Sequence, residues 1–178
     1  MAEINALFDL LRLYVARDLD RLVAEGVRVR VIGERSGLQQ DIAGIIADAE
    51  MRTRGNDKLH LTIAFNYGGQ DEIARAARRI AEEAAAGRLA PAEVTPTRFE
   101  SYLDTADLPP PDLLIRTGGD YRISNFLLWN LAYTELYVCD VLWPDFSVEH
   151  LEDAIGVYSG RERRFGLVLE PCEQHRAS

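Results

Sequence analysis

Apolar residues in the first 65 positions alternate between a helical and an extended spacing. They recur at helical spacing over residues 4–23, and Gly26 follows where a helix C-terminal cap is expected. Valines then alternate with arginines over residues 27–32, the period-two pattern of a strand. A second helical stripe over residues 38–49 precedes a second strand over 59–65. The order of elements is therefore helix, strand, helix, strand.

The rest of the chain continues the same alternation. The pattern predicts six further elements: a helix over 73–84 stopped by Gly87, a short helix opened by Thr95-Pro96, a buried strand over 112–115, an apolar helix over 126–133 with Ser124 as its N-cap, a strand over 136–142, and a final helix from Ser147 to near Phe165.

Strands separated by helices favour parallel pairing through crossover connections. We therefore predict an α/β fold, a mostly parallel sheet with helices on both faces. Ligands of open parallel sheets bind outside the carboxyl ends of the strands. Three polar loops that carry glycine follow strands here, Gly33 to Arg35, Asn66 to Gly69 and Arg116 to Asp120, and we expect them to share one edge of the sheet.

Length and charge narrow the class of protein. With 178 residues, 47% of them apolar, we expect one domain over residues 1–166 and a loose tail over 167–178. The formal net charge of −9 argues against nucleic acid as a partner, because binding to phosphate backbones depends on a broad basic face. Lys58 is the only lysine, which excludes a Gly-Lys-Ser/Thr phosphate loop. Any anion site must therefore be local and built from arginines.

The N-terminus lacks the pattern of a secretory signal, and no stretch approaches the roughly 18 apolar residues of a membrane span. The two cysteines and three histidines show no zinc-ligand spacing. These patterns predict a cytoplasmic protein with reduced thiols.

The segment from Arg116 to Asn125 carries the densest group of polar residues. Two glycines allow close approach of the backbone to a ligand, and the segment leads into a predicted helix N-terminus, which attracts anions. The guanidinium forks of Arg116 and Arg122 suit bidentate contact with phosphate. One interpretation is a diphosphate site. The alternative is a strand-to-helix turn in which Ser124 only caps and the arginines pair with Asp120 and Asp112.

Three other features each allow more than one interpretation. Glu135 lies among apolar neighbours and is exposed, ion-paired, or a ligand for a hard cation such as Mg²⁺. The charged run from Arg161 to Gly166 is a candidate site, although a solvated helix end is the simpler interpretation. The glycines of the loop from Asn66 to Gly69 either approach a ligand or only turn the chain, with Asp71 capping the next helix.

Six ordered motifs together resemble the cis-prenyltransferase family. They are Phe65 to Gly69, Asp112 to Gly119, Arg122 to Trp129, Glu135 to Tyr137, Val141 to Phe146 and Arg161 to Gly166. The resemblance runs from about Glu3 to Gly166. It implies an α/β fold like that of undecaprenyl diphosphate synthases and a Mg²⁺-dependent reaction. In that reaction isopentenyl diphosphate adds to an allylic diphosphate such as farnesyl diphosphate, giving a cis-polyprenyl diphosphate such as undecaprenyl diphosphate.

The resemblance also implies roles for particular residues. Arg116, Arg122, Ile123 and Ser124 match the residues that hold isopentenyl diphosphate, and Glu135 matches a Mg²⁺ carboxylate. Arg164 and Gly166 match an element that reaches the substrate site of a neighbouring subunit, so the resemblance implies a homodimer. Release of a lipid product implies peripheral contact with a membrane.

The sequence also departs from the family pattern. It contains neither the His-x-x-Met-Asp-Gly-Asn-x-Arg-Trp segment, whose aspartate holds Mg²⁺, nor the Ser-x-Glu-Asn-Trp-x-Arg-Pro stretch, and position 120 is Asp where many relatives have Glu. We expect a domain that lacks the family's N-terminal strand and phosphate loop, has no catalytic aspartate of its own and is inactive alone.

Three hypotheses remain open at this point. The first is a prenyl transferase whose recorded N-terminus is incomplete. The second is a non-catalytic family member, either a partner subunit or a degenerate chain that binds isopentenyl diphosphate. The third is an α/β module that binds another phosphorylated ligand through Arg116 and Arg122.

Overall fold

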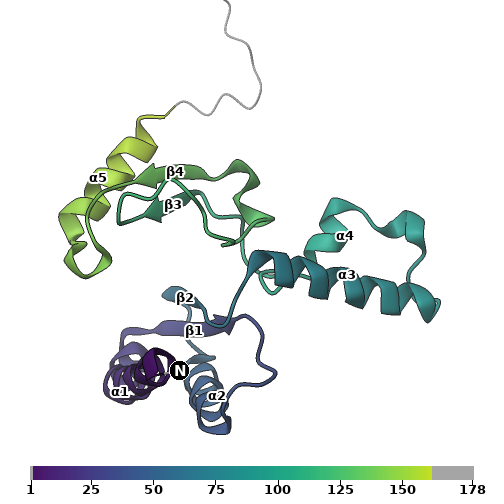
Figure 1. The fold of residues 1–178 in the computed structure, drawn as a ribbon, viewed down its shortest axis with the longest axis horizontal. Coiled ribbons are helices and arrows are strands. Elements are labelled where there is room, and N and C mark those ends of the chain that lie inside the picture. Colours follow the sequence, from purple (N-terminus) through teal and green to yellow (C-terminus); the bar gives the residue numbers. More distant parts are fainter. Residues whose placement is uncertain (1, 162–178) are drawn as a thin grey trace, which may run out of the picture. The chain divides into compact units, whose positions relative to one another are not determined.

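The computed structural model describes residues 2–161, and their contacts group into two compact units. Unit 1 comprises the residues up to Pro109 together with Ser124–Asn130, and unit 2 comprises Pro110–Ile123 together with the residues from Leu131 onward. Each unit contains helices and one pair of parallel strands (Figure 1). The α/β class with parallel strands is thus confirmed, whereas helices on both faces of one sheet and a single domain over 1–166 stay predictions.

Unit 1 contains most of the regular structure. Its elements are α1 (Ala2–Glu25), β1 (Val27–Ile32), α2 (Gln40–Thr53), β2 (Leu59–Ala64), α3 (Gly69–Ala85), the 3-10 helix η1 (Pro91–Glu93) and α4 (Pro96–Glu100).

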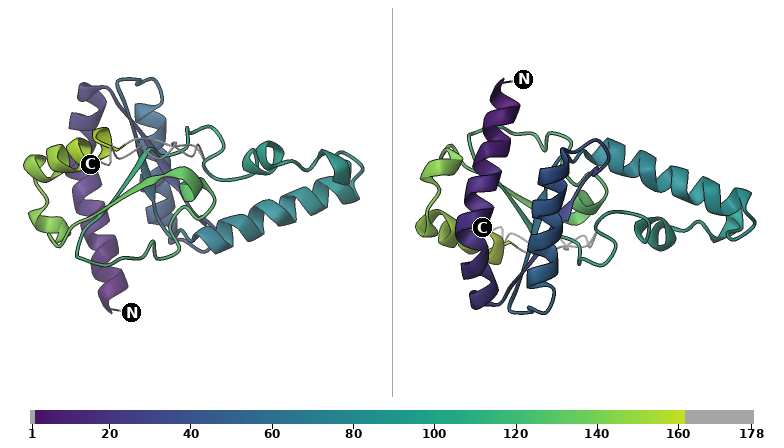
Figure 2. Two further views of the ribbon diagram at one scale, coloured as in Figure 1. Left: turned by 90° about the horizontal axis from the view of Figure 1, so that it is seen from above. Right: turned by 90° about the horizontal axis from the view of Figure 1, so that it is seen from below.

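The core of unit 1 lies between the β1–β2 pair and two helices. The strands pair in parallel from Val27 opposite Leu59 to Ile32 opposite Ala64. Helices α1 and α2 lie side by side and pack against β1 (Figure 2). The alternation of β1 turns its valines toward these helices, where Val27 and Val29 are buried with Leu19. The arginines of β1 consequently point to the opposite face.

Side chains saturate the edge of β1 that faces away from β2. The Val29 N–H donates to Oγ1 of Thr53 (3.0 Å), and the Val31 N–H donates to Oε1 of Glu50 (2.8 Å). Nδ2 of Asn56 donates to the Val27 carbonyl (2.9 Å). Unpaired edge groups would otherwise be exposed for pairing with another chain. Polar residues at the end of α2 therefore close this edge of the sheet.

Unit 2 is built on β3 (Leu113–Arg116) and β4 (Glu135–Val138), which pair in parallel with Arg116 opposite Val138. The 3-10 helix η2 (Asn130–Tyr133) precedes β4, and η3 (Trp143–Asp145) leads to α5 (Val148–Ser159). Ser147 and His150 form a capping box at the start of α5.

Two helix ends predicted from capping residues are confirmed. Gly26, with φ of 78°, directly follows α1, and Thr95 accepts a hydrogen bond from the Arg98 N–H (3.2 Å) as the N-cap of α4. Two boundaries expected from the sequence lie too far along the chain. Strand β4 ends at Val138 rather than Leu142, because its partner β3 ends at Arg116 and the chain then turns through Gly118 and Gly119, whose φ values are left-handed. Helix α5 ends at Ser159 rather than near Phe165.

The helix predicted over residues 126–133 is wrong, since only the short η2 forms there. Ser124, Asn125 and Leu127 have φ values of 48°, 63° and 43°, which lie in the left-handed region and cannot belong to a right-handed helix. Ser124 is therefore not the N-cap of an apolar helix.

No helix among the described residues has the length and apolar composition that a membrane span requires.

Candidate functional site

The loop after β3 is folded by glycine. Gly118 and Gly119 have φ values of 83° and 74°, and their N–H groups donate to the carbonyls of Val141 (2.9 Å) and Cys139 (3.0 Å). A Cβ atom on Gly119 would lie 2.9 Å from a carboxylate oxygen of Asp140. The glycines thus bend the chain at the carboxyl end of β3 and tie it to the residues after β4.

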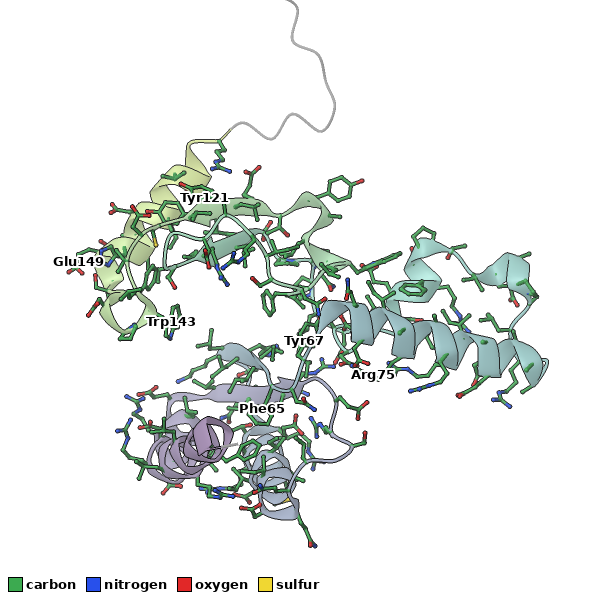
Figure 3. All side chains as sticks on the ribbon, viewed as in Figure 1. Phe65, Tyr67, Arg75, Tyr121, Trp143 and Glu149 are labelled. Atoms are coloured by element: carbon green, nitrogen blue, oxygen red, sulfur yellow. The ribbon has the colours of Figure 1, made fainter. Side chains whose placement is uncertain are left out.

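This loop borders a cavity in unit 2 with a volume of about 520 Å³. It is lined by Leu114, Arg116, Asp120, Tyr121, Arg122, Ile123, Leu136, Tyr137, Val138 and Arg161. The charged lining consists of three arginines and one aspartate, in a chain whose net charge is −9. The lining thus combines apolar side chains with mostly basic charged ones, which suits an anion attached to a hydrocarbon group. Tyr121, labelled in Figure 3, is the exposed aromatic residue of this loop and also lines the cavity.

Asp120 is the present partner of both loop arginines. It accepts from Nη2 of Arg122 (2.7 Å) and from Nη2 of Arg116 (3.2 Å). This part of the alternative interpretation, in which the arginines pair with Asp120, is confirmed. One carboxylate does not saturate two guanidinium groups, however. Nε of Arg116 is buried and has no hydrogen-bond partner among the described residues. Arg116 therefore keeps one donor that Asp120 does not use.

Glu135, for which three interpretations were open, is ion-paired. Its carboxylate pairs with Nη1 of Arg161, whose Nη2 donates to the Leu136 carbonyl (3.1 Å). Within residues 2–161 no group of three or more potential metal ligands lies together. Mg²⁺ needs six oxygen ligands, so the protein side chains described here do not fit a Mg²⁺ site by themselves.

Ser124 belongs to unit 1, whereas Arg116, Arg122 and Ile123 belong to unit 2. The loop does not run into a helix N-terminus, so the predicted dipole and free N–H groups are not available to an anion there. Left-handed φ values at non-glycine residues cost of order 1–3 kcal/mol each and persist only where the surroundings hold them. Contacts with neighbouring residues must therefore stabilise the left-handed backbone conformation of Ser124.

The loop from Asn66 to Gly69 lies beside the first polar loop, as predicted. The Glu34 N–H donates to the Asn66 carbonyl (3.1 Å), and Nδ2 of Asn66 donates to the Glu34 carbonyl (2.7 Å). The N-cap of α3 is Gly68, so Asp71 lies within the first turn and does not cap. The third loop, Arg116 to Asp120, lies in the other unit.

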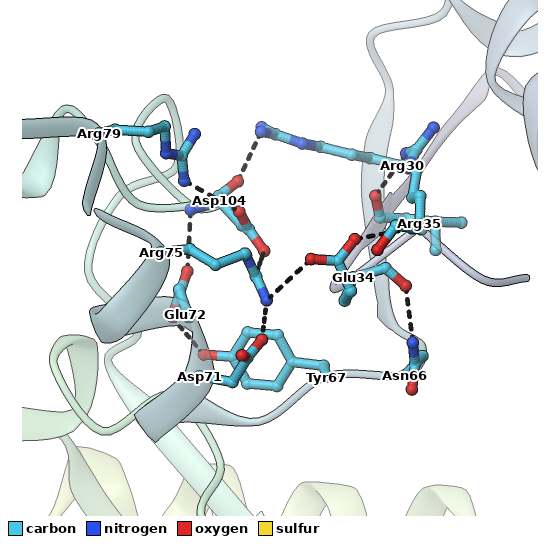
Figure 4. Close-up of polar contacts among 12 residues, drawn as sticks. Arg30, Glu34, Arg35, Asn66, Tyr67, Asp71, Glu72, Arg75, Arg79 and Asp104 are labelled. Carbon is cyan, nitrogen blue, oxygen red and sulfur yellow. Dashed lines mark hydrogen bonds and ion pairs between the residues drawn. The ribbon is translucent and has the colours of Figure 1, made fainter. Parts of the chain in front are cut away.

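A partly buried network of ion pairs and hydrogen bonds fixes the start of α3 (Figure 4). Arg75, only 12% exposed, pairs with Asp71, Asp104 (2.6 Å) and Glu34 (3.9 Å). Glu72 is fully buried and accepts from the Asp104 N–H (2.9 Å) and from the Tyr67 hydroxyl (2.5 Å).

Burial and the adjacent Glu72 carboxylate both raise the pKa of Tyr67 above its ordinary value. Tyr67 therefore remains a neutral donor at physiological pH. The network positions the loop before α3. The Tyr67 hydroxyl does not lose its proton near neutral pH, so it does not serve as a general base.

Two predicted site residues, Arg164 and Gly166, lie outside the described residues. Two residues with clear structural roles were not assigned one from the sequence. Arg161 lines the cavity, and only its place in the charged run pointed to it. Asn125 contacts the start of α3, and no local signal reveals a partner 55 positions away.

The structure is thus an α/β protein with parallel strands, a glycine-bent loop at a strand's carboxyl end and a cavity whose lining includes three arginines. The family model described as "Putative undecaprenyl diphosphate synthase" matches residues 1–166. An isoprenyl transferase of Caulobacter vibrioides is 52% identical over 166 residues. A ditrans,polycis-undecaprenyl-diphosphate synthase specific for (2E,6E)-farnesyl diphosphate, from Pseudomonas syringae, is 46% identical over 171 residues.

Among solved structures, the lavandulyl diphosphate synthase of Lavandula x intermedia, in complex with dimethylallyl diphosphate, superposes with a TM-score of 0.90 at 36% identity. The match covers 94% of this chain and 72% of that one. The chain belongs to the undecaprenyl diphosphate synthase family of prenyltransferases. The match to the Caulobacter relative covers 93% of this chain but only 64% of that relative's length. The match to the Pseudomonas relative covers 96% of this chain and 68% of that relative's length.

Proposed function

We propose that the chain is part of a cis-prenyl transferase, in which it holds isopentenyl diphosphate for condensation with an allylic diphosphate such as farnesyl diphosphate. The product is a cis-polyprenyl diphosphate such as undecaprenyl diphosphate. Similarity to isoprenyl transferases at about 50% identity supports the class of reaction. Arg116, Arg122, Ile123 and Ser124 are the proposed contacts of the isopentenyl diphosphate.

The observation that carries this proposal is the cavity of unit 2, whose charged lining residues are three arginines and one aspartate. Arg116 and Arg122 share the single carboxylate of Asp120, and a phosphate group is an acceptor that also carries the complementary charge. Leu114, Leu136 and Val138 supply an apolar wall for the five-carbon group. The pocket thus matches both halves of isopentenyl diphosphate.

The proposed contribution of these side chains to the reaction is positional. Guanidinium forks hold the diphosphate at fixed points, so that the alkene is presented in one orientation to the carbon of the allylic partner that becomes cationic. The apolar wall excludes water, which would otherwise capture that cation.

Glu135 is proposed to supply one carboxylate to Mg²⁺, with the remaining ligands coming from substrate phosphates and from residues beyond those described. Arg161 now holds this carboxylate. Mg²⁺ is usually bound by one or two carboxylates together with phosphates, so a single Glu135 is compatible with that role. No step of the proposed positioning depends on the ion.

Calorimetric titration with isopentenyl diphosphate tests the proposal. Arg122→Ala should abolish binding, and Arg116→Ala should weaken it roughly ten- to a hundred-fold, since each removes charged hydrogen bonds to phosphate. Arg88→Ala is the matched control, because Arg88 pairs with Glu83 in unit 1 and its loss changes the net charge equally. Unchanged affinity in both site variants would reject the assignment.

A non-catalytic family member that only binds isopentenyl diphosphate is the second candidate. It rests on one observation, that residues 1–178 contain no His-x-x-Met-Asp-Gly-Asn segment. We expect the 178-residue polypeptide to form no product from radiolabelled isopentenyl diphosphate and farnesyl diphosphate with Mg²⁺. Product above background would contradict this expectation.

The proposed partners are a second copy of the chain and, during product release, a membrane surface. In the homodimer, Arg164 and Gly166 would reach the neighbouring subunit's diphosphate. The exposed apolar side chains of unit 2, among them Leu142, Trp143 and Val148, support an interface there.

A further inference from the structure

Two loops that the sequence presents as separate motifs are joined within unit 1. The Asn125 backbone carbonyl accepts from the Gly69 N–H (2.7 Å), and Oδ1 of Asn125 accepts from the Gln70 N–H (2.9 Å). Both N–H groups belong to the first turn of α3, whose N-cap Gly68 has no side chain to accept them. Asn125 therefore caps α3 from 55 positions further along the chain.

The glycine pair before α3 fits this contact closely. A Cβ atom on Gly69 would lie 2.8 Å from Cγ of Leu128 and 3.1 Å from the Asn125 carbonyl oxygen. A Cβ atom on Gly68 would lie 2.9 Å from Nδ2 of Asn125. Both glycines are thus explained by close packing against residues 125–128, which leaves a phosphate-binding role for this loop unnecessary.

A second contact fixes the same segment from the side. The Tyr67 ring packs edge-on against Phe126, with ring centroids 6.1 Å apart. Its hydroxyl donates to the buried Glu72 carboxylate (2.5 Å). The left-handed residues Ser124, Asn125 and Leu127 are consequently held at both ends of the turn, which is the condition under which such conformations persist.

We infer that Asn125 is a positioning residue that sets the orientation of the Ser124 hydroxyl by docking the 124–128 turn on the start of α3. The inference rests on the proposed function, in which that hydroxyl contacts the diphosphate. Ser124 is exposed, and its hydroxyl makes no hydrogen bond within the described part of the chain. The backbone that Asn125 holds therefore fixes the direction of the Ser124 Cα–Cβ bond, and with it the positions that the hydroxyl can reach.

A double-mutant cycle read by calorimetry with isopentenyl diphosphate tests the inference. Ser124→Ala and Asn125→Ala should each weaken binding by a similar factor, roughly tenfold for one hydrogen bond to a charged group. The double variant should bind no more weakly than either single variant, because Asn125 acts through Ser124. Asn125→Asp keeps the acceptor for the Gln70 N–H and should restore most of the affinity.

Asn125→Gly serves where Asn125→Ala is too unstable to study. Glycine adopts a φ of 63° without strain, so this variant removes the side-chain cap and leaves the backbone conformation accessible. It should weaken binding like the alanine variant. Thermal unfolding of each variant gives the stability change separately from the affinity change.

Two outcomes would overturn the inference. Wild-type affinity in Asn125→Gly, together with a lowered melting temperature, would make Asn125 purely structural. Multiplicative losses in the double variant would show that Asn125 acts independently of Ser124. Arg116→Ala separates these outcomes from failure of the proposed function, since it tests diphosphate binding without involving Asn125.

Discussion

At the scale of single residues, backbone geometry at Gly33 is the sharpest constraint in unit 1. Gly33 has φ of 121°, and a Cβ atom there would collide with the Phe65 carbonyl oxygen and lie 3.1 Å from the Asn66 carbonyl oxygen. Backbone atoms cannot move aside as a flexible side chain can. The position therefore excludes every other residue type.

We expect Gly33→Ala to lower the free energy of unfolding by more than about 2 kcal/mol, through left-handed strain and the collision together. Gly37→Ala is the control, since Gly37 has φ of 80° but a methyl group at this position would meet no other atom within 4 Å. It should cost only the strain, about 1 kcal/mol. Urea denaturation midpoints measure both changes, and equal losses would mean that the collision is relieved.

At the scale of elements, the edge of β1 depends on the charge of Glu50. Burial raises the pKa of this carboxyl, but hydrogen bonds from Arg35 and from the Val31 N–H outweigh burial and leave it below the ordinary value of 4.5. A lowered pKa stabilises the folded state fully above the ordinary value, and the contribution is lost as the pH falls through the folded-state pKa.

Glu50→Gln should therefore reduce stability by about 0.5–1 kcal/mol at pH 7 and make no difference near pH 3. Melting temperatures measured across this range test the prediction, with Glu152→Gln on the exposed side of α5 as the control. A pH-independent difference would attribute the loss to packing rather than to charge.

The element that was predicted wrongly shows where local pattern fails. Apolar residues over 126–133 have the spacing of a helix, but Asn125 bonds to α3, and Trp129 stacks on Phe99 with ring centroids 4.6 Å apart. Contacts with distant residues thus stabilise this segment as a turn with left-handed residues. The spacing of apolar residues alone does not predict such a turn.

At the scale of the whole molecule, an apolar stripe on α5 bears on assembly. Val148, Leu151 and Ile155 follow one helix face at i, i+3 and i+7 and are 66%, 41% and 49% exposed. Unpartnered apolar faces of this kind mark interaction sites. The stripe therefore supports the proposed homodimer.

We expect the chain to sediment as a dimer and the Leu151→Glu/Ile155→Glu variant to sediment as a monomer, because two buried charges would oppose association. Met51→Glu, at an exposed apolar position on α2, should leave the dimer intact. A dimer that persists in the α5 variant would place the interface elsewhere.

The sequence by itself determined the parallel α/β class, the bounds of β1, the caps at Gly26 and Thr95, the family and the arginines of the cavity. These follow from local periodicity, capping chemistry and ordered motifs, which need no knowledge of distant contacts. Only the tertiary structure decided that Asp120 bridges Arg116 and Arg122, that Arg161 holds Glu135 and that Asn125 caps α3. Each of these contacts joins residues that lie 2 to 55 positions apart in the sequence. Packing of the folded chain, and not the local pattern of residues, decides which of these side chains come into contact.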